Sequence, residues 1–449
     1  MSHEVREILK GGSDMKLTFT RLLFTSIAVS LIMIFAAACS SEPEVVIETV
    51  EVEKIVEVEK IVEVEKQKGD TVKIGTLLDY TGDLATYGIP MRNGADLAAE
   101  LINQAGGLLG GDVQAVHRDS GTSETVAIEA ARFLITKHGV GGIVGSLSSG
   151  VTMATANAVT IPQGVVLISP ASTSPAITVM EDDDLLFRST VSDAAQGVVL
   201  ATLARELGYE TASAIYVNNA YGEGLARVFE AVFQMAGGKV LALVPQESGQ
   251  ASYISEVKAA TEGNPDVVLA LSYPESAGVY LREALEGGFA DTFMFADGTK
   301  AQTMFDDLGV ENFEGLYGTA PVAPDSSAKE TFEQLYEERF GQLPTNPFLG
   351  ETFDAFILLA LAIEAAGAAD GHSIKDSLRD IANAPGEQVG PGDLAKALDL
   401  LRDGKDIDYE GVAGSQSIDQ NGDVLNTIEI WKIEGGLIVS TGRFESPAP

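Results

Sequence analysis

The sequence is poor in cysteine, histidine and basic side chains, and each shortage excludes a class of function. Cys39 is the one cysteine among 449 residues, so neither an intrachain disulfide nor a cysteine zinc site can form. The four histidines are His3, His117, His138 and His372, and they are isolated from the cysteine and from one another in the sequence. We therefore expect no metal site and no cofactor.

Basic residues number 29 against 66 acidic residues, which gives a formal net charge of −37. Binding to a phosphate backbone requires a concentrated set of Lys and Arg, so we exclude a nucleic-acid partner. Solubility or an organism-wide bias accounts for the acidity, which carries no information about a ligand.

Catalytic motifs are missing as well. The chain has no Gly-x-Ser-x-Gly elbow, and its glycine-rich stretch 142–150 lacks the Gly-Lys-Ser/Thr of a phosphate loop. Asp419–Asp423 imitates the start of a calcium loop, but Val424 and Ile430 stand where Gly and Glu are required. Without a nucleophile–base pair, we predict a protein that is not an enzyme.

The N-terminal region has the layout of a secretory signal peptide. A basic segment from Met15 to Arg21 precedes an apolar run, 27–38, which ends directly before Cys39. We predict that residues 1–38 are a signal peptide, with 1–14 as an extension, and that Cys39 becomes lipid-modified and anchors the chain. A plain signal peptide that happens to contain a cysteine is the alternative, and Ala36 stands where lipoprotein signals most often have Leu.

A charged repeat follows the cysteine. Residues 49–66 contain three copies of a six-residue Val/Glu/Lys unit, a period that matches no sustained helical seam. Charged repeats extend by self-repulsion, so we predict that residues 39–70 are a linker between the membrane and the folded domain. A short oligomerising coil is the alternative.

From Thr71 onward, apolar strands alternate with helical patterns. Helical faces are predicted from Met91, Ala95, Ala98 and Ile102, and again from Leu225, Phe229, Val232 and Ala236. The predicted strands lie at 72–76, 113–116, 143–144, 165–168, 212–217, 240–244, 267–271 and 293–295. Strands separated by helices indicate βαβ units and an α/β fold with parallel sheets.

The tail of the chain has a different pattern. Helices are predicted at 327–340, 348–366, 373–382 and 392–403, followed by strands with hairpin turns at Asn421-Gly422 and Gly435-Gly436.

The loops that leave the predicted strands are candidates for a ligand site, because ligands of open parallel sheets bind outside the carboxyl ends of the strands. These loops are 78–90, 145–152, 169–175, 218–223, 272–276 and 296–300. Two of them are rich in hydroxyls, with Ser146, Ser148, Ser149 and Thr152 in one and Ser169–Pro175 in the next. Hydroxyls and backbone N–H groups at helix starts can hold a carboxylate, although ordinary helix capping explains any single serine equally well.

Short motifs in a fixed order give the chain a specific resemblance. From Lys73 to about Asp423 it resembles the periplasmic leucine/isoleucine/valine-binding family, the type I solute-binding proteins of ABC transporters. The motifs are Asp79-Tyr-Thr-Gly82, Tyr87-Gly88, Asn93-Gly94-Ala95, Ile102-Asn103-x-x-Gly106-Gly107, Ile168-Ser-Pro-Ala171, Phe187-Arg188, Asp193-x-x-Gln196-Gly197, Ala220-Tyr-Gly222, Tyr273-Pro-Glu275 and Asp423.

The resemblance implies two Rossmann-like lobes joined by a three-strand hinge. We expect one lobe to comprise 71–190 plus 322–415, and the other 191–321 plus 416–449. Three departures from the family are visible: the early acidic pair is replaced by Asp119-Ser-Gly121, the disulfide of some relatives is impossible, and 385–412 is an insertion.

The resemblance also implies roles for individual residues. Ser149 and Thr173, with the backbone of Ala171 and Ser172, match the positions that bind a ligand carboxylate. Asp297 matches the acidic residue that accepts a ligand ammonium, and a helix cap is its alternative role. The aromatic walls of the side-chain pocket would be Tyr87, Tyr221 and Tyr273.

The implied function is capture of a branched-chain amino acid, or a similar amino-acid-like molecule, by lobe closure outside the cytoplasm. The implied partners are an ABC transporter permease and the membrane that holds the lipid anchor, with the chain itself a monomer. A sensory receptor of the same fold, binding amides or other small organic acids, is the alternative.

Overall fold

A computed structural model of the protein describes residues 69–446, which belong to one compact unit, Lys66–Pro449. The predicted signal peptide, Cys39 and almost all of the linker lie outside the described residues, so those predictions stay untested.

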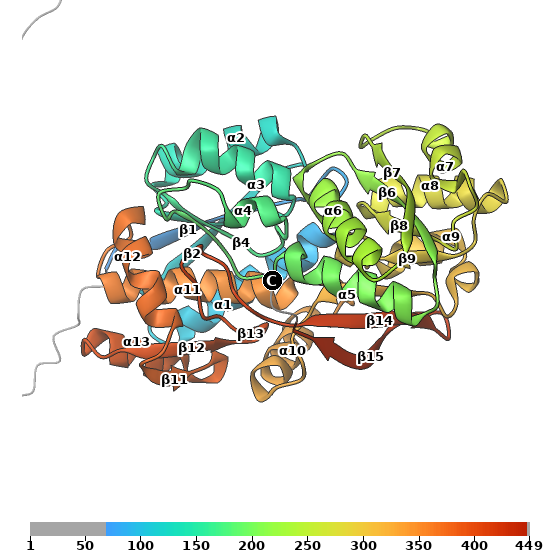
Figure 1. The fold of residues 1–449 in the computed structure, drawn as a ribbon. Helices are drawn as coiled ribbons and strands as arrows, with labels where there is room; N and C mark the ends of the chain where they lie inside the picture. The colour runs from blue at the N-terminus through green and yellow to red at the C-terminus, as the bar shows by residue number, and fades with distance from the viewer. Residues whose placement is uncertain (1–68, 447–449) are drawn as a thin grey trace, which may run out of the picture. The chain divides into compact units, whose positions relative to one another are not determined.

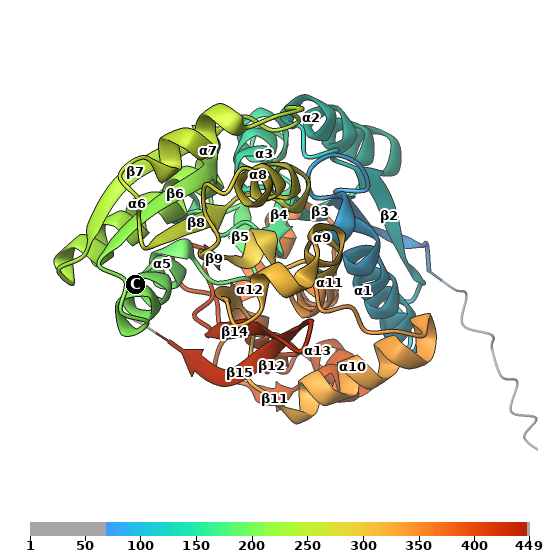
Figure 2. The same cartoon turned by 90° about the vertical axis from the view of Figure 1, so that its right-hand side faces the viewer.

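The first sheet has five parallel strands in the order β2-β1-β3-β4-β5. Figure 1 labels β1, β2 and β4 of this sheet. Their bounds are β1 (Val72–Leu78), β2 (Val113–Asp119), β3 (Gly142–Gly145), β4 (Val166–Ser169) and β5 (Leu186–Arg188). Because side chains of a strand alternate between faces, Ile74 and Leu78 pack into one buried cluster and Leu77 into another. The sheet is thus covered on both sides, with α1 (Ala85–Gln104) and α11 (Leu349–Ala366) on one face and α2 (Glu124–Phe133) on the other (Figure 2).

The second sheet repeats the same strand order and then adds a hairpin. Five parallel strands are ordered β7-β6-β8-β9-β10, and β14 and β15 extend the sheet antiparallel beyond β10. The bounds are β6 (Thr211–Val217), β7 (Lys239–Gln246), β8 (Val267–Leu271), β9 (Phe293–Phe295), β10 (Tyr317–Pro321), β14 (Ile428–Glu434) and β15 (Leu437–Glu445). In each sheet the order reverses beside the first strand, and this reversal is where parallel sheets bind ligands.

Helices connect the strands as the alternating pattern predicts. Those not yet named in the first half of the chain are η1 (Leu134–His138), α3 (Ser149–Thr155), η2 (Ala156–Thr160) and α4 (Pro175–Thr178). Those between the strands of the second sheet are α5 (Asp193–Glu206), α6 (Ala220–Met235), α7 (Ile254–Thr261), α8 (Pro274–Glu286), η3 (Asp297–Thr299), α9 (Gln302–Leu308) and η4 (Val310–Phe313).

The tail adds helices and a small third sheet beside the first sheet. The elements are α10 (Ser327–Phe340), α12 (Gly371–Ala382), β11 (Glu387–Val389), η5 (Pro391–Asp393), α13 (Leu394–Arg402), β12 (Ile407–Gly411) and β13 (Gly414–Ser415). Helices α10, α11 and α13 contact α1, and α12 contacts β4, so this part completes the first lobe. The predicted insertion 385–412 accounts for β11, α13 and β12, and the predicted tail helices agree with the structure to within two residues at each end.

The helical faces are confirmed with one exception. Met91, Ala95, Ala98 and Ile102 of α1 are all buried. In α6 the predicted fourth position was wrong, because the helix ends at Met235 and Ala236 is exposed beyond it.

Asn421-Gly422 was predicted as a hairpin turn, and the structure has a turn there. It joins Ile418 and Val424, which form an isolated antiparallel bridge. Asp419 Oδ1 accepts hydrogen bonds from the backbone N–H groups of Asn421 and Asp423. The Gly435-Gly436 turn does join β14 to β15 as a hairpin.

The chain passes between the two sheets three times: after β5, after β10 and before β14. This arrangement gives the predicted α/β fold of two parallel-sheet lobes joined by a three-strand hinge. The lobe boundaries at 190/191, 321/322 and 415/416 remain predictions.

Within residues 69–446, no single helix has the length and hydropathy needed to cross a bilayer. The bent pair α11–α12, with 105° between its helices, passes that test by length and composition only.

Candidate functional site

A small cavity lies where the strand-end loops of the two lobes meet. It is lined by Leu84, Tyr87, Leu147, Ser149, Ala171, Tyr221, Tyr273, Asp297, Gly298 and Phe348. All six loops selected from the sequence contribute to this lining. The space that this lining leaves free is small, so the cavity suits only a compact ligand.

Six of the eight predicted ligand-binding residues line the cavity, and two do not. Ser172 Oγ donates to Leu147 O at 3.0 Å, and its backbone N–H donates to Ser169 Oγ. Thr173 Oγ1 donates to Asp193 Oδ2 at 2.9 Å. Both side chains are buried and already paired within the protein, so their contact with a ligand stays a prediction.

The serine-rich loops combine capping with other contacts. Ser174 Oγ accepts from the N–H of Ala176 at the start of α4, and it also donates to Ala220 O in the second lobe at 2.8 Å. Ser148, by contrast, makes no side-chain cap bond at the start of α3. Ser149 Oγ accepts from the N–H of Ser174 at 3.2 Å, which ties the two loops together beside the cavity. Capping therefore explains Ser174 but not Ser148 or Ser149.

Asp297 is a buried carboxyl on the second lobe's side of the cavity. It follows β9, and its Oδ1 accepts from Gln196 Nε2 at 2.8 Å and from the Tyr221 hydroxyl at 3.0 Å. Burial raises its pKa to about 6, while these two hydrogen bonds act in the opposite direction. The Tyr87 hydroxyl, from the first lobe, donates to the main-chain oxygen of Asp297 at 3.1 Å.

A second buried carboxyl, Asp193, was missed as a site residue. Its Oδ2 accepts from Thr173, and its Oδ1 is buried with no hydrogen-bond partner in the described part of the chain. Burial is the main cause that raises the pKa of Asp193 well above its usual value, and repulsion by Asp297 adds to it. Two interacting buried carboxyls favour a cation nearby, because a positive charge lowers the cost of ionising them.

The aromatic walls come from both lobes. The rings of Tyr221 and Tyr273 stack with their centroids 5.5 Å apart and their planes 9° apart. The Tyr273 hydroxyl donates to Ser148 Oγ at 3.0 Å and accepts from Asn219 Nδ2 at 3.0 Å, so this ring also joins the lobes. Burial raises the pKa of both phenols above the ordinary tyrosine value, which keeps them protonated as hydrogen-bond donors.

Gly298 permits the close approach of Tyr221 to this site. A Cβ at position 298 would lie 2.5 Å from Ser272 O and 2.7 Å from the Tyr221 hydroxyl oxygen. Any larger residue would displace the hydroxyl that donates to Asp297. Phe348, on the opposite wall, has a φ of 73°, an unusual conformation for a bulky residue.

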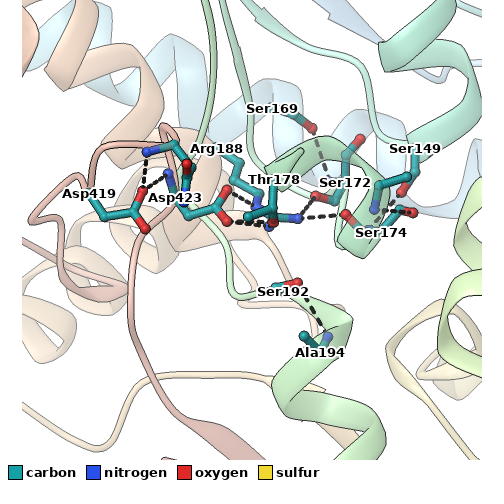
Figure 3. A network of polar contacts seen from close by, with 12 residues as sticks. Ser149, Ser169, Ser172, Ser174, Thr178, Arg188, Ser192, Ala194, Asp419 and Asp423 are labelled. Carbon is teal, nitrogen blue, oxygen red and sulfur yellow. Dashed lines mark hydrogen bonds and ion pairs between the residues drawn. The ribbon is translucent and has the colours of Figure 1, made fainter. Parts of the chain in front are cut away.

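An ion pair at the hinge contacts the 172–178 loop. Arg188 Nε donates to Asp423 Oδ1 at 2.6 Å and its Nη2 donates to Oδ2 at 2.7 Å, with the guanidinium fully buried (Figure 3). Arg188 Nη1 also donates to Ser174 O at 3.0 Å, and Nη2 donates to Thr178. The Asp419 turn positions Asp423 for this contact, so the pair fixes the shape of the 172–178 loop that borders the cavity.

The lobes touch directly around the cavity through Tyr87 and Asp297, Tyr273 and Ser148, and Ser174 and Ala220. Closure of the site therefore brings groups from both lobes around any ligand it holds. No cluster of three or more His, Cys, Asp or Glu side chains within residues 69–446 is suited to a metal ion.

A family model described as "Periplasmic binding protein" matches residues 71–395. The chain belongs to the periplasmic binding protein family. A leucine-, isoleucine-, valine-, threonine- and alanine-binding protein of Pseudomonas aeruginosa is 28% identical over 69% of this chain and 82% of its own length. A chemotactic signal transduction system substrate-binding protein, BasB of Halobacterium salinarum, is 27% identical over 77% of this chain and 83% of its own.

Solved structures agree with this assignment. The leucine-binding protein LivK of Thermotoga maritima superposes with a TM-score of 0.71 at 25% identity, covering 84% of this chain and 99% of that one. A solute-binding protein of an ABC transporter from R. palustris, in complex with benzoate, has a TM-score of 0.69 at 19% identity, covering 85% and 98%. The predicted resemblance to the leucine/isoleucine/valine-binding group of type I solute-binding proteins is confirmed. The similar proteins named above are solute-binding proteins.

Sequence reasoning missed Asp193, Gln196, Phe348 and the Arg188–Asp423 pair as parts of the site. The first two and the pair lie within motifs that carried the resemblance, but a motif alone does not say which side chains meet. Phe348 has no sequence signal, because it enters the site from the tail between α10 and α11.

Proposed function

We propose that the protein is an extracytoplasmic solute-binding protein of an ABC importer that captures a branched-chain amino acid, or a similarly small amino-acid-like ligand, between its lobes. The observation that carries this proposal is the position of Asp297. Its buried carboxyl lines the same compact cavity as Ser149 and Ala171, so one ligand would meet a carboxyl from one lobe and hydroxyl and N–H donors from the other.

The ligand carboxylate would bind the loops at Ser149 and Ala171, where a hydroxyl and helix-start N–H groups are available. The ligand ammonium would bind Asp297, and a charge-assisted bond in a desolvated site is among the stronger polar contacts. Leu84, Leu147 and Phe348 would surround an apolar side chain. Because the ligand contacts both lobes, its binding energy favours closure.

The N-terminal sequence and the family resemblance suggest the cellular context. Cys39 would anchor the chain to a membrane through a lipid, the linker 39–70 would separate the anchor from the lobes, and a permease would receive the ligand. The protein would act as a monomer and bind its ligand without converting it.

Thermal-shift measurement of the purified full-length protein against amino acids, short amides and aromatic acids tests the proposal. A ligand at a hundredfold excess over its dissociation constant stabilises the native state by about 2.7 kcal/mol. We expect the largest shift with an aliphatic amino acid. A shift with benzoate-type acids alone would retain the binding role and reject Asp297 as the ammonium acceptor.

The alternative is a sensory receptor of the same fold, and the similarity to BasB, a chemotactic substrate-binding protein, favours keeping it. The two readings differ in the partner. Genes for a permease and an ATPase beside the gene for this chain would support transport, whereas a neighbouring transducer gene would support sensing.

A further inference from the structure

A second cavity lies at the hinge, on the other side of Phe348 from the first. Its volume is about 290 Å³, and it opens between the crossover after β10, the segment before α11, and strands β14 and β15. Helix α10 and strand β12, which border this region, lie beside one another in Figure 2. Its lining is largely apolar and includes Val322, Phe332, Leu343, Phe348, Leu349 and Val412.

The two lysines that line this cavity already have partners. Lys300 Nζ pairs with Glu429 Oε2 at 2.7 Å, with both side chains almost fully buried. Lys329 Nζ donates to Asp325 Oδ1 at 3.1 Å and to Ala323 O at 3.1 Å. Neither ammonium is therefore left for a ligand to neutralise.

Glu351 also lines this cavity, and its carboxyl has no ion-pair partner among the described residues. It lies in the first turn of α11, is 7% exposed and lines the cavity. Within residues 69–446, the one donor to its carboxyl is its own backbone N–H. Its neighbour Asp354 is satisfied elsewhere, by the Tyr409 hydroxyl and by the backbone N–H groups of Val412 and Ala413.

The electrostatic environment of Glu351 favours an added cation. Burial raises its pKa to about 8 and repulsion by Asp354 adds to the shift, whereas the charges of Lys300 and Lys329 lower it. Glu333, half-buried on α10, brings a second carboxyl to the lining, and burial raises its pKa too. A carboxyl held in this way is costly to ionise without a counter-charge.

We propose that the hinge cavity is a second ligand site, which binds a primary ammonium group attached to an apolar body. The ammonium pairs with Glu351, and the apolar body packs on Phe332, Leu343 and Phe348. The site is separate from the proposed amino-acid site, because the two cavities share Phe348 as a wall and no other residue. No ligand carboxylate is required, since both lysines are already paired.

Isothermal titration of the full-length protein at pH 7 tests this with three probes that share one ring: benzylamine, benzyl alcohol and benzoate. We expect one benzylamine to bind per chain, with at least tenfold weaker binding of the other two. Equal or tighter binding of benzyl alcohol or benzoate would overturn the proposal, as would the absence of benzylamine binding at millimolar concentration. This comparison requires no variant.

Variants locate the site. Glu351→Gln should weaken benzylamine binding at least tenfold. Glu330 is an exposed glutamate on α10, so Glu330→Gln should leave the binding unchanged. Binding that survives Glu351→Gln, or that is lost in Asp297→Asn instead, would assign the amine to the first cavity and overturn the proposal.

Proton exchange gives an independent readout. At pH 7 the empty protein holds Glu351 mostly protonated, so an ammonium that pairs with its carboxylate must displace that proton. Titrations in two buffers of different ionisation enthalpy should therefore reveal release of up to one proton, which Glu351→Gln abolishes. Benzylamine binding with no proton release in either protein would contradict the pairing with Glu351.

Discussion

The Tyr221 hydroxyl lies 3.0 Å from Asp297 Oδ1 and donates a hydrogen bond to it. Gln196 donates to the same oxygen at 2.8 Å. The side-chain donors among the described residues thus reach Oδ1 alone, and backbone N–H groups of Asp297 and Gly298 also act on the carboxyl. This relationship fixes the carboxyl in place before a ligand arrives, which reduces the ordering cost of binding.

Replacing Asp297 by Asn keeps the size of the side chain and removes its charge. Loss of a hydrogen bond to a charged group costs about 1.5–3 kcal/mol, so we expect roughly ten- to hundredfold weaker binding of the amino-acid ligand. Titration calorimetry measures the affinity, and circular dichroism checks that the fold is retained. Asp291→Asn is the matched control, because Asp291 is an exposed carboxyl just before the same strand. Equal effects of the two variants would reject the role of Asp297.

The affinity for an amino acid should depend on pH near 6. The pKa of Asp297 is raised to about 6 in the empty protein, and the ammonium requires the ionised carboxyl. Lowering the pH from 7 to 5 protonates most of it and should weaken binding roughly tenfold. Titrations between pH 5 and 7 measure this, and the slope should flatten in Asp297→Asn.

The stability of the empty protein should fall as the pH rises, whereas the affinity for the ligand should increase. A carboxyl whose folded pKa is raised contributes stability that is fully present below its unfolded value near 3.8 and is lost as the pH rises through about 6. Asp193 has a raised pKa as well and interacts with Asp297, so the pair titrates together. Urea denaturation at pH 5 and pH 7 should show a lower free energy of unfolding at pH 7. A free energy of unfolding that increases from pH 5 to pH 7 as Asp297 ionises would contradict the burial of the carboxyl.

The Arg188–Asp423 pair should be important for stability. Removing one partner of a buried ion pair leaves an uncompensated charge, so Arg188→Met should cost about 3–5 kcal/mol in urea denaturation. Arg339→Met is the control, because Arg339 forms a bidentate ion pair with Glu100 at the surface. This substitution should cost no more than about 1 kcal/mol. Combining Arg188→Met with Asp423→Leu should recover part of the loss. Equal costs for the buried and surface variants would show that Arg188 does not hold the loop.

Much of this fold follows from local patterns in the sequence. Ile74, Leu77 and Leu78 specify a strand buried on both faces, and Met91 to Ile102 specify a helix with one buried face. Helix α6 shows the limit of such reasoning: Ala236 fits the period, but the helix ends one residue earlier and Phe233 fills the core.

The sequence predicted which loops form the site, but it did not predict all of the contacts that their side chains make. Strand ends meet at one edge of a parallel sheet whatever their side chains are, so all six loops were found. Which hydroxyl faces the cavity depends on rotamers and tertiary partners, and Thr173 turns to Asp193 for that reason. Phe348 reaches the site through a contact between segments about 200 residues apart in the chain, which no local period encodes.

Calorimetric titration of leucine against two truncated analogues tests the central claim most directly. 4-Methylpentanoate lacks the ammonium of leucine, and 3-methylbutylamine lacks its carboxylate. If the first lobe binds the carboxylate and Asp297 binds the ammonium, leucine binds and each analogue binds at least a hundredfold more weakly to the first cavity. Binding of 4-methylpentanoate as tight as that of leucine would contradict the account, because Asp297 would then have no ammonium to accept.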